Sequence, residues 1–517
     1  MKPDYSMTDT STNNKRIAKN TLLLYFRMFF IMAVTLFTSR VVLSALGVED
    51  YGIYNVVGGI VAMMGVLNGA MSVSTQRYLT FELGRGDMVR LKQTFSLCLT
   101  IFFLLSIVLV VLAETIGLWF LNTQLVIPQE RMAAANWIYQ FSILSCISSL
   151  ITMPYNAAII AHERMNVYAY IGIIEVILKL VIVYLILILP ADRLISYGFL
   201  FMVSHFIVTG IYIGYCMRKF VETRYTWFWE KSLFKELVSY SGWNLFGSLS
   251  GIVKGQGLNI LLNMFFNPAV NAARGIAFQI NAAITQFFTN FYTAVRPQIT
   301  KYYAQGNMEE MHKLIFRSSK LSFYLIMLIS LPIIIEAPYI VNLWLGQLPE
   351  YVVPFTRLII AISAVDCMAT PLMTAAHATG NIRLYQSSVG TMTILNVPIS
   401  YIFLKLGYSP LMVFYISLAI AVICLFMRLW IVRRLMEFPV MEYIVKVFGT
   451  CLMVCAISLI LPLAAHLMLE EGFISVVMVC LISLISSIVG IYFVGMDNKE
   501  KQFVWEIINK KILHKKN

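Results

Sequence analysis

The sequence is poor in charge for its length. Only 13% of the 517 residues are Asp, Glu, Lys or Arg, whereas 59% are hydrophobic and the mean hydropathy is +0.77. Soluble globular domains carry roughly 25% charged residues. This shortage excludes a chain of soluble domains and indicates a protein that crosses a membrane several times. Residues 1–20 are polar, and the apolar run after them is too long for a signal peptide and has no small-residue cleavage site, so we expect no cleaved leader.

Motifs for metal binding, phosphate binding and catalysis are missing as well. The eight cysteines lie in apolar stretches without any C-x-x-C pair, which predicts buried free thiols. His162-Glu163 begins like the zinc motif H-E-x-x-H, but Asn166 stands at the second histidine position, so we interpret this triplet with Arg164 as a topological turn. The stretch 251–257, "GIVKGQG", lacks the G-K-[ST] ending of a phosphate loop. We therefore expect no enzyme, no metal and no organic cofactor.

Apolar stretches of the length that crosses a bilayer, about 20 residues each, recur along the whole chain. They predict fourteen spans, at 20–44, 51–76, 93–121, 132–161, 166–189, 194–217, 236–265, 269–295, 318–342, 353–378, 384–404, 408–430, 441–466 and 472–496. The loops and tails on the N-terminal side of the membrane carry 28 Lys and Arg residues, with Arg428 counted among them, against 3 in the loops on the other side. By the positive-inside rule both termini face the cytoplasm. The net charge of +13 therefore reflects topology, and we expect no nucleic-acid partner.

Two stretches six spans apart share one pattern. "PYNAAIIAHERMNVY" (154–168) and "PLMTAAHATGNIRLY" (371–385) both follow Pro-x6-Ala-x6-Tyr, at an offset of 217. A second match recurs at an offset of 219 to 220, between Arg77 with Gly86-Asp87-Met88 and Arg296 with Gly306-Asn307-Met308. Because six is even, both halves keep the same orientation in the membrane. This is the parallel-repeat arrangement of transporters, with a substrate site between two lobes.

These patterns predict an all-α polytopic membrane protein with two pseudo-symmetric six-helix lobes and two added C-terminal helices. Its expected segments are a cytoplasmic N-terminal segment 1–19, an N-lobe 20–217, a cytoplasmic linker 218–235, a C-lobe 236–434, a helix pair 441–496 and a basic cytoplasmic tail 497–517.

Cations inside the spans are the candidate substrate ligands. An ionised side chain at the bilayer centre costs about 2.5–3.5 kcal/mol, so such residues normally face the protein interior or a water-filled cavity. Arg27, Lys179, Lys254 and Arg274 lie at successive depths, where an outward-moving anionic group such as a phosphate meets them in turn. Lys254 is flanked by three glycines, which predicts a locally broken helix.

Two acidic residues inside the spans are candidates for coupling to H+ or Na+. Glu175 stands four residues before Lys179, a spacing that favours an internal ion pair over a ligand role. Asp366 has no cation three or four residues away, so it either binds a coupling ion or pairs with a cation on another helix. Both alternatives stay open for Asp366.

Two prolines inside spans are the candidate hinges. Pro154 and Pro371 begin the repeated motif, and each removes one backbone hydrogen bond from its helix. Such a kink allows bending during alternating access, or else it only shapes the packing.

The segment 40–87, "RVVLSALGVEDYGIYNVVGGIVAMMGVLNGAMSVSTQRYLTFELGRGD", resembles the second-helix region of Wzx-type polysaccharide flippases. These transport O-antigen and capsule oligosaccharides and belong to the multidrug/oligosaccharidyl-lipid/polysaccharide (MOP) exporter superfamily. The resemblance is carried by Leu46-Gly47, Asp50-Tyr51-Gly52, Tyr54, the small-residue run to Gly69, Arg77 and Gly86-Asp87.

This resemblance implies outward flipping of an undecaprenyl-pyrophosphate-linked oligosaccharide across the bacterial inner membrane by alternating access. The lipid tail would stay in the bilayer, and cavity cations would bind the pyrophosphate or anionic sugars, with Arg27 and Arg274 at matching positions. The implied partners are the lipid-linked oligosaccharide and membrane lipids, and polysaccharide polymerase or glycosyltransferase machinery stays open as a further partner. The alternatives are a cation-coupled multidrug (MATE-type) exporter, a lipid-II-type peptidoglycan precursor flippase, and a membrane glycosyltransferase or polymerase, which the short loop at Glu49-Asp50 disfavours.

Overall fold

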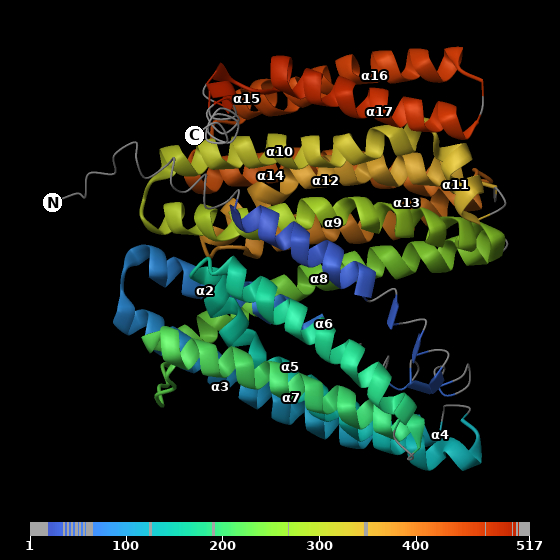
Figure 1. Cartoon of the computed structure of the whole chain (residues 1–517). Coiled ribbons are helices and arrows are strands. Elements are labelled where there is room, and N and C mark those ends of the chain that lie inside the picture. The colour runs from blue at the N-terminus through green and yellow to red at the C-terminus, as the bar shows by residue number, and fades with distance from the viewer. Residues whose placement is uncertain are drawn as a thin grey trace, which may run out of the picture. The chain divides into compact units, whose positions relative to one another are not determined.

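A computed structural model of the chain describes residues 19–34, 37–38, 41–42, 45–46, 50, 53–54, 57, 66–123, 127–188, 192–266, 268–345, 350–470, 472–498, 500–502 and 505. The regular structure of these residues is helical, with long α-helices and short 3-10 and π segments (Figure 1). The predicted all-α polytopic fold is thereby confirmed. Residues 1–18, most of the tail 497–517 and much of 40–65, where the family resemblance begins, lie outside the described set.

The chain divides into two compact units, of which the first comprises Met1–Ser248 and Thr293–Asn307. Its helices include α2 (Val66–Arg85), α3 (Met88–Leu112), α4 (Leu118–Thr123), α5 (Met132–Ala161), α6 (Met165–Ile188) and α7 (Arg193–Lys219), with the π segment η1 (Ala113–Gly117) and the 3-10 segments η2 (Gln129–Arg131) and η3 (Val221–Thr223). Helix α5 is the centre of this unit, because it packs against α2, α3, α6 and α7.

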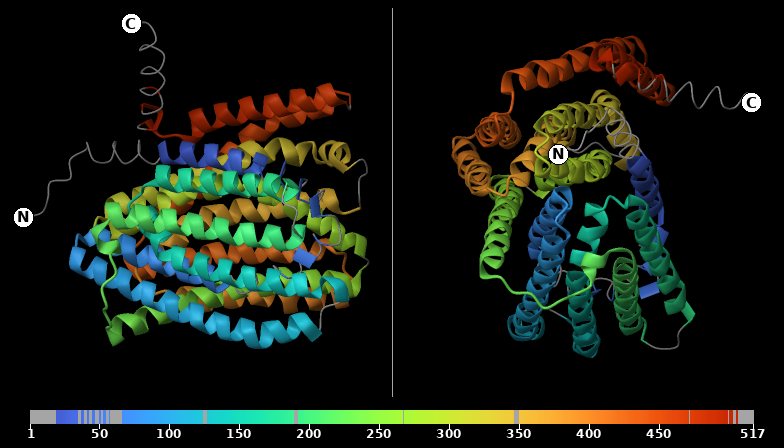
Figure 2. Two further views of the ribbon diagram at one scale, coloured as in Figure 1. Left: turned by 60° about the horizontal axis from the view of Figure 1, so that its bottom comes forward. Right: turned by 90° about the vertical axis from the view of Figure 1, so that its left-hand side faces the viewer.

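The second unit comprises Leu249–Tyr292 and Met308–Asn517. Its helices include α10 (Met308–Ile335), α11 (Ala337–Leu345), α12 (Val352–Ala378), α13 (Arg383–Lys405), α14 (Leu411–Met436), α15 (Val440–Tyr443), α16 (Thr450–Met468) and α17 (Phe473–Gly490), with the π segments η4 (Ile444–Gly449) and η5 (Ile491–Gly495). Helices α16 and α17 pack against each other and run side by side in Figure 1, at the red end of the colour scale that Figure 2 shares.

Helices α8 (Lys231–Phe265) and α9 (Pro268–Ala304) belong to both units. Helix α8 is in the first unit up to Ser248, and α9 returns to it at Thr293. They have 35 and 37 residues, which corresponds to lengths of more than about 50 Å. The sequence-based N-lobe ends at residue 217, so the compact units divide inside these two helices and not in the linker 218–235.

The two halves pair their helices in the same way. In the first unit α3 packs on α5, α5 on α7 and α6 on α7, and in the second α10 packs on α12, α12 on α14 and α13 on α14. The repeated sequence motifs end in turns of the same hand, with φ of 75° at Gly86 and 72° at Gly306, and 57° at Glu163 and 81° at Gly380. The pairing of helices in the first unit therefore recurs in the second, although the turns at Gly86 and Gly306 both lie in the first unit.

Ten of the described helices are long and apolar enough to cross a membrane. They are Met88–Thr123, Gln129–Ala161, Met165–Ile188, Arg193–Lys219, Met308–Ile335, Val352–Ala378, Arg383–Lys405, Leu411–Met436, Val440–Met468 and Phe473–Gly495. They match ten of the fourteen predicted spans. The predicted spans 20–44 and 51–76 lie partly outside the described residues, and 236–265 and 269–295 correspond to α8 and α9, which have the length to cross a bilayer.

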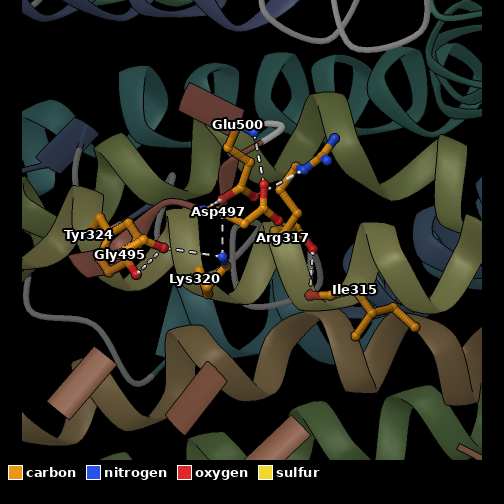
Figure 3. A network of polar contacts seen from close by, with 8 residues as sticks. Ile315, Arg317, Lys320, Tyr324, Gly495, Asp497 and Glu500 are labelled. Atoms are coloured by element: carbon orange, nitrogen blue, oxygen red, sulfur yellow. Dashed lines mark hydrogen bonds and ion pairs between the residues drawn. The ribbon is translucent and has the colours of Figure 1, made fainter. Parts of the chain in front are cut away.

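The C-terminal helices are fixed to α10 by a polar network (Figure 3). The Glu500 carboxylate accepts hydrogen bonds from Arg317 Nε at 3.2 Å and from Lys320 Nζ at 3.1 Å. Lys320 Nζ and Tyr324 Oη also donate to the carbonyl of Gly495, each at 3.2 Å. Three residues of α10, each about one turn from the next, thus bind Gly495 and Glu500 after α17. These contacts fix α16 and α17, the helix pair outside the repeat, within the second unit.

Candidate functional site

Arg27 is a cation enclosed by helix α6. Its guanidinium lies over the ring of Tyr168, 4.4 Å from the ring centroid, and also interacts electrostatically with Tyr212 of α7. The guanidinium needs a glycine beside it, because a Cβ at position 172 would lie 2.3 Å from Arg27 Nε. Among the described residues Nε has no hydrogen-bond partner and Arg27 forms no ion pair. Arg27 is thus a half-buried positive charge that lies on the face of one aromatic ring and has no acidic partner among the described residues.

Glu175 and Lys179 form the ion pair that their spacing predicts. The Lys179 Nζ to Glu175 Oε1 distance is 2.7 Å. The ammonium also lies 5.6 Å from the centroid of the Phe201 ring, which packs edge-on against His205. The internal ion pair is confirmed, and the proposed roles of Lys179 in substrate binding and of Glu175 in ion coupling stay predictions.

Asp366 pairs with a cation on another helix. Its Oδ1 lies 3.6 Å from Arg428 Nη1 of α14, and Arg428 Nε donates to Tyr385 Oη at 2.9 Å. Lys254 of α8 lies close enough to Asp366 for an electrostatic interaction. The side chain of Asp366 is 48% exposed, whereas that of Arg428 is 15% exposed. Asp366 therefore has a cationic partner and still presents half of its carboxylate to its surroundings.

The interpretation of Arg428 as a cation at the end of its span was incomplete. The sequence assigns it to the cytoplasmic end of the predicted span 408–430, but α14 continues to Met436 and the Arg428 side chain is largely buried. The signal that could have found it is Tyr385, because this tyrosine ends the repeated motif and its counterpart Tyr168 also contacts an arginine.

Arg274 joins α9 to α8. Its Nη2 donates to the carbonyl of Gly255 at 2.8 Å and its Nη1 to Asn259 Oδ1 at 3.1 Å. The guanidinium also lies 4.4 Å from the centroid of the Phe278 ring. All of these partners are neutral, so the positive charge of Arg274 is not compensated by them.

The break predicted around Lys254 does not occur, because α8 is an uninterrupted helix from Lys231 to Phe265. One of the three glycines instead permits close packing. A Cβ at Gly257 would lie 2.8 Å from Val397 of α13, which is closer than a side-chain contact allows. Small residues let neighbouring helices approach each other. The glycines near Lys254 therefore indicate close helix packing, at Gly257, and not a break in the helix.

The two candidate hinge prolines lie buried inside continuous helices, Pro154 in α5 and Pro371 in α12. Proline frees carbonyl groups in the turn before it. Before Pro371, the carbonyl of Met368 accepts hydrogen bonds from Ser319 Oγ at 3.1 Å and from Tyr443 Oη at 2.9 Å. The carbonyl three residues before Pro371 is thus bound by side chains of two other helices. Whether either proline acts as a hinge stays a prediction.

The turn at 162–164 does more than reverse the chain, and its role was missed in the sequence. Glu163 has a left-handed backbone, and its side chain is 2% exposed. Its carboxylate accepts hydrogen bonds from Lys301 Nζ, at 2.5 Å, and from Gln298 Nε2, both on the part of α9 that belongs to the first unit. A glutamate carries no sequence signal for a left-handed turn, which glycine normally provides.

His162 binds the linker that follows α7. Its ring stacks on Phe220 with centroids 4.0 Å apart, and its Nε2 contacts the Glu222 carboxylate. Burial alone would raise the pKa of Glu222, but hydrogen bonds from His162 and from its own backbone hold that pKa below its ordinary value. The charged triplet is therefore a point where the turn, the linker and α9 meet within the first unit.

Comparisons with known proteins agree on the fold. No protein-family model matches the chain, and no curated protein does. Among solved structures, a MATE in complex with MaD3S superposes with a TM-score of 0.67 at 15% identity, covering 82% of this chain and 97% of that one. The outward-facing conformation of a multidrug resistance MATE family transporter of the MOP superfamily gives 0.68 at 15% identity, with coverage of 82% and 97%. The MATE transporter ClbM in complex with Rb+ gives 0.67 at 16%, with coverage of 82% and 95%.

The chain has the MATE fold. One of these neighbours is described as a transporter of the MOP superfamily, which is the superfamily that the sequence resemblance suggests. The ten long apolar helices agree with a multi-pass membrane protein. At 15% identity the likeness extends to the fold and not to the substrate.

Proposed function

We propose that this chain is a membrane transporter of the MOP superfamily whose substrate carries an anionic group. Its charged side chains support this. Within the predicted spans the described residues include eight cations and six acids, namely Arg27, Lys179, Lys254, Arg274, Lys320, Arg357, Arg428 and Lys446 against Glu114, Glu175, Glu236, Glu336, Asp366 and Glu442. Because Arg27 and Arg274 contact only neutral groups among the described residues, each keeps a charge available for an anion. This surplus of cations is the observation that carries the proposal.

The substrate we propose is an undecaprenyl-pyrophosphate-linked oligosaccharide, flipped outward for surface polysaccharide synthesis. A pyrophosphate suits arginine, which binds phosphate oxygens through two parallel N–H donors. The resemblance of 40–87 to Wzx-type flippases supports the same substrate, and a lipid-II-type precursor has the same anionic chemistry. In this proposal the chain lies in the bacterial inner membrane with both termini in the cytoplasm, and the enzymes that assemble the glycan are its functional partners.

A cation-coupled multidrug exporter is the second candidate, and the structural comparisons favour it over the flippase. The neighbours reported above are MATE transporters, and one of them is a complex with Rb+. In this chain the half-exposed carboxylate of Asp366 is the group we propose for binding H+ or Na+. Coupling to an ion is compatible with both substrates, because an inward ion gradient can drive either.

The test is to delete the gene and analyse the lipid-linked glycans. We expect a polyprenyl-pyrophosphate oligosaccharide to accumulate facing the cytoplasm, and we expect wild type to reverse this but Arg27→Glu and Arg274→Glu not to. Lys219→Glu, at the exposed end of α7, is the matched control and should complement fully. Unchanged glycan pools together with greater sensitivity to cationic drugs would select the exporter instead. If neither phenotype appears, both candidate functions are contradicted.

A further inference from the structure

The linker between α7 and α8 runs along the first turns of α3. Tyr225 Oη lies 3.2 Å from Thr100 Oγ1, and the backbone N–H of Thr226 donates to Ser96 Oγ at 3.3 Å. Further along the linker, Glu230 binds the Arg90 guanidinium with two contacts of 2.5 and 3.1 Å. Successive linker residues therefore contact α3 at positions 100, 96 and 90, so the linker descends the helix antiparallel to it.

This segment exposes aromatic and aliphatic side chains beside a basic helix end. Trp227 is 77% exposed, and Trp229, Tyr225 and Val221 are exposed as well. Met88 and Val89, at the start of α3, are exposed next to them. Tryptophan and tyrosine concentrate where a bilayer meets water, because their apolar rings and polar N–H or O–H groups suit both sides of that boundary. The linker therefore has the composition of a segment at the membrane interface.

A cavity of about 340 Å³ lies between the linker and α3. Met88, Val89, Lys92 and Gln93 line it on one side, and Trp227 and Phe228 on the other. Its volume lies at the lower end of the range for small-molecule sites, about 300–1,000 Å³. The cavity thus has room for a headgroup, but its apolar walls do not suit a strongly hydrated solute.

Lys92 supplies an uncompensated charge to this cavity. It forms no ion pair with any residue in the described part of the chain, whereas the neighbouring Arg90 is neutralised by Glu230. On the same face of α3, Ser96 and Thr100 are contacted by the linker, and Phe103 and Ile107 follow beyond it at helical spacing. Phe103 and Ile107 are exposed apolar side chains on this face. A charge at one end and an apolar stripe at the other match the two ends of a phospholipid.

We propose that this cavity binds the phosphodiester headgroup of an anionic bilayer lipid, whose acyl chains lie along the exposed face of α3. Lys92 faces the phosphate, the indole N–H of Trp227 donates to the headgroup, and Met88 and Val89 contact the first methylenes. This lipid is a resident of the surface of the first unit and not the transported substrate, so the proposal goes beyond the proposed function and does not depend on it.

The test is native mass spectrometry of the purified full chain with phosphatidylglycerol or phosphatidylcholine of identical acyl chains. Wild type should retain one phosphatidylglycerol more tightly than any phosphatidylcholine. Lys92→Gln and Trp227→Ala should each weaken that binding about tenfold, because each removes one polar contact to a charged phosphate. Lys92→Arg should keep it. The controls are Lys235→Gln, an exposed cation on α8 away from the cavity, and Trp119→Ala, an exposed tryptophan on α4.

Three results would overturn the proposal. They are equal retention of the two lipids, equal losses in Lys92→Gln and Lys235→Gln, and displacement of the lipid by free glycerol phosphate, which would identify a site for soluble anions. Elution of each variant as a single species in detergent micelles shows that it is folded. Because no transport is measured, these outcomes are distinguishable from a failure of the flippase or exporter hypothesis.

Discussion

In the segment 154–168 the left-handed position of the turn is Glu163, whereas in its counterpart 371–385 it is Gly380. Glycine adopts this backbone freely, but another residue pays roughly 1–2 kcal/mol for it. The first half keeps the strained residue where its carboxylate is buried and bound to Lys301 and Gln298. The same backbone turn therefore only reverses the chain in the second half, whereas in the first half it also holds a buried ion pair.

The tyrosines that end the two segments also differ, in the group that each uses to contact an arginine. Tyr168 offers its ring face to Arg27, whereas Tyr385 offers its hydroxyl to Arg428. Arg428 is balanced by Asp366, and Arg27 has no acidic partner in the described structure. Each half therefore has one arginine without an acidic partner among the described residues, Arg27 in the first and Arg274 in the second.

The largest expected effect comes from breaking the ion pair of the first turn. Lys301→Ala leaves the Glu163 carboxylate buried without its cation, and loss of one partner of a buried pair costs about 3–5 kcal/mol. We expect a marked fall in the melting temperature of the purified protein, measured by tryptophan fluorescence in detergent. Lys313→Ala removes a lysine from the exposed pairs with Glu309 and Glu310 and should leave the melting temperature unchanged. Equal effects of the two substitutions would show that the Glu163 pair is no more important than a surface pair.

The next experiment makes the first turn resemble the second. Glu163→Gly removes both the backbone strain and the charge, so in the Lys301→Ala background it should restore stability by at least about 1 kcal/mol. In the wild-type background it should destabilise less than Lys301→Ala does. The double-mutant cycle of melting temperatures measures this coupling. Additive effects of the two substitutions would contradict the pairing.

A third and smaller effect distinguishes the two tyrosines. Tyr385→Phe deletes the acceptor of Arg428 Nε and should cost about 1–2 kcal/mol, because a largely buried donor is left unsatisfied. Tyr168→Phe keeps the ring beneath Arg27 and should change stability by less than about 0.5 kcal/mol. Thermal unfolding of the two variants side by side checks the contrast. A larger loss for Tyr168→Phe would mean that its hydroxyl, and not its ring, holds Arg27.

Most of the fold was predictable, because apolar runs of bilayer length and a repeat at a constant offset depend on sequence alone. The partners of Asp366 and of Glu163 were not, since Arg428 and Lys301 are distant in sequence and their charges also satisfy the positive-inside rule. The glycines around Lys254 misled because the same residue type serves helix breaks and close helix packing. Of the candidate site, the Glu175–Lys179 pair was predictable because its two residues are neighbours on one helix.

The smallest expected effect concerns the two proline kinks. The carbonyl of Met368, three residues before Pro371, has two side-chain donors, whereas the carbonyl of Ile151, three residues before Pro154, has none among the described residues. Ser319→Ala removes one donor and leaves Tyr443, so we expect a loss of about 0.5–1 kcal/mol. Amide hydrogen exchange should become faster in the turn around Pro371 and stay unchanged around Pro154, with Ser318→Ala on the same helix as the control. If the turn around Pro154 already exchanges faster than that around Pro371 in wild type, Pro154 is the better candidate for a hinge, because a kink without side-chain donors bends at lower cost.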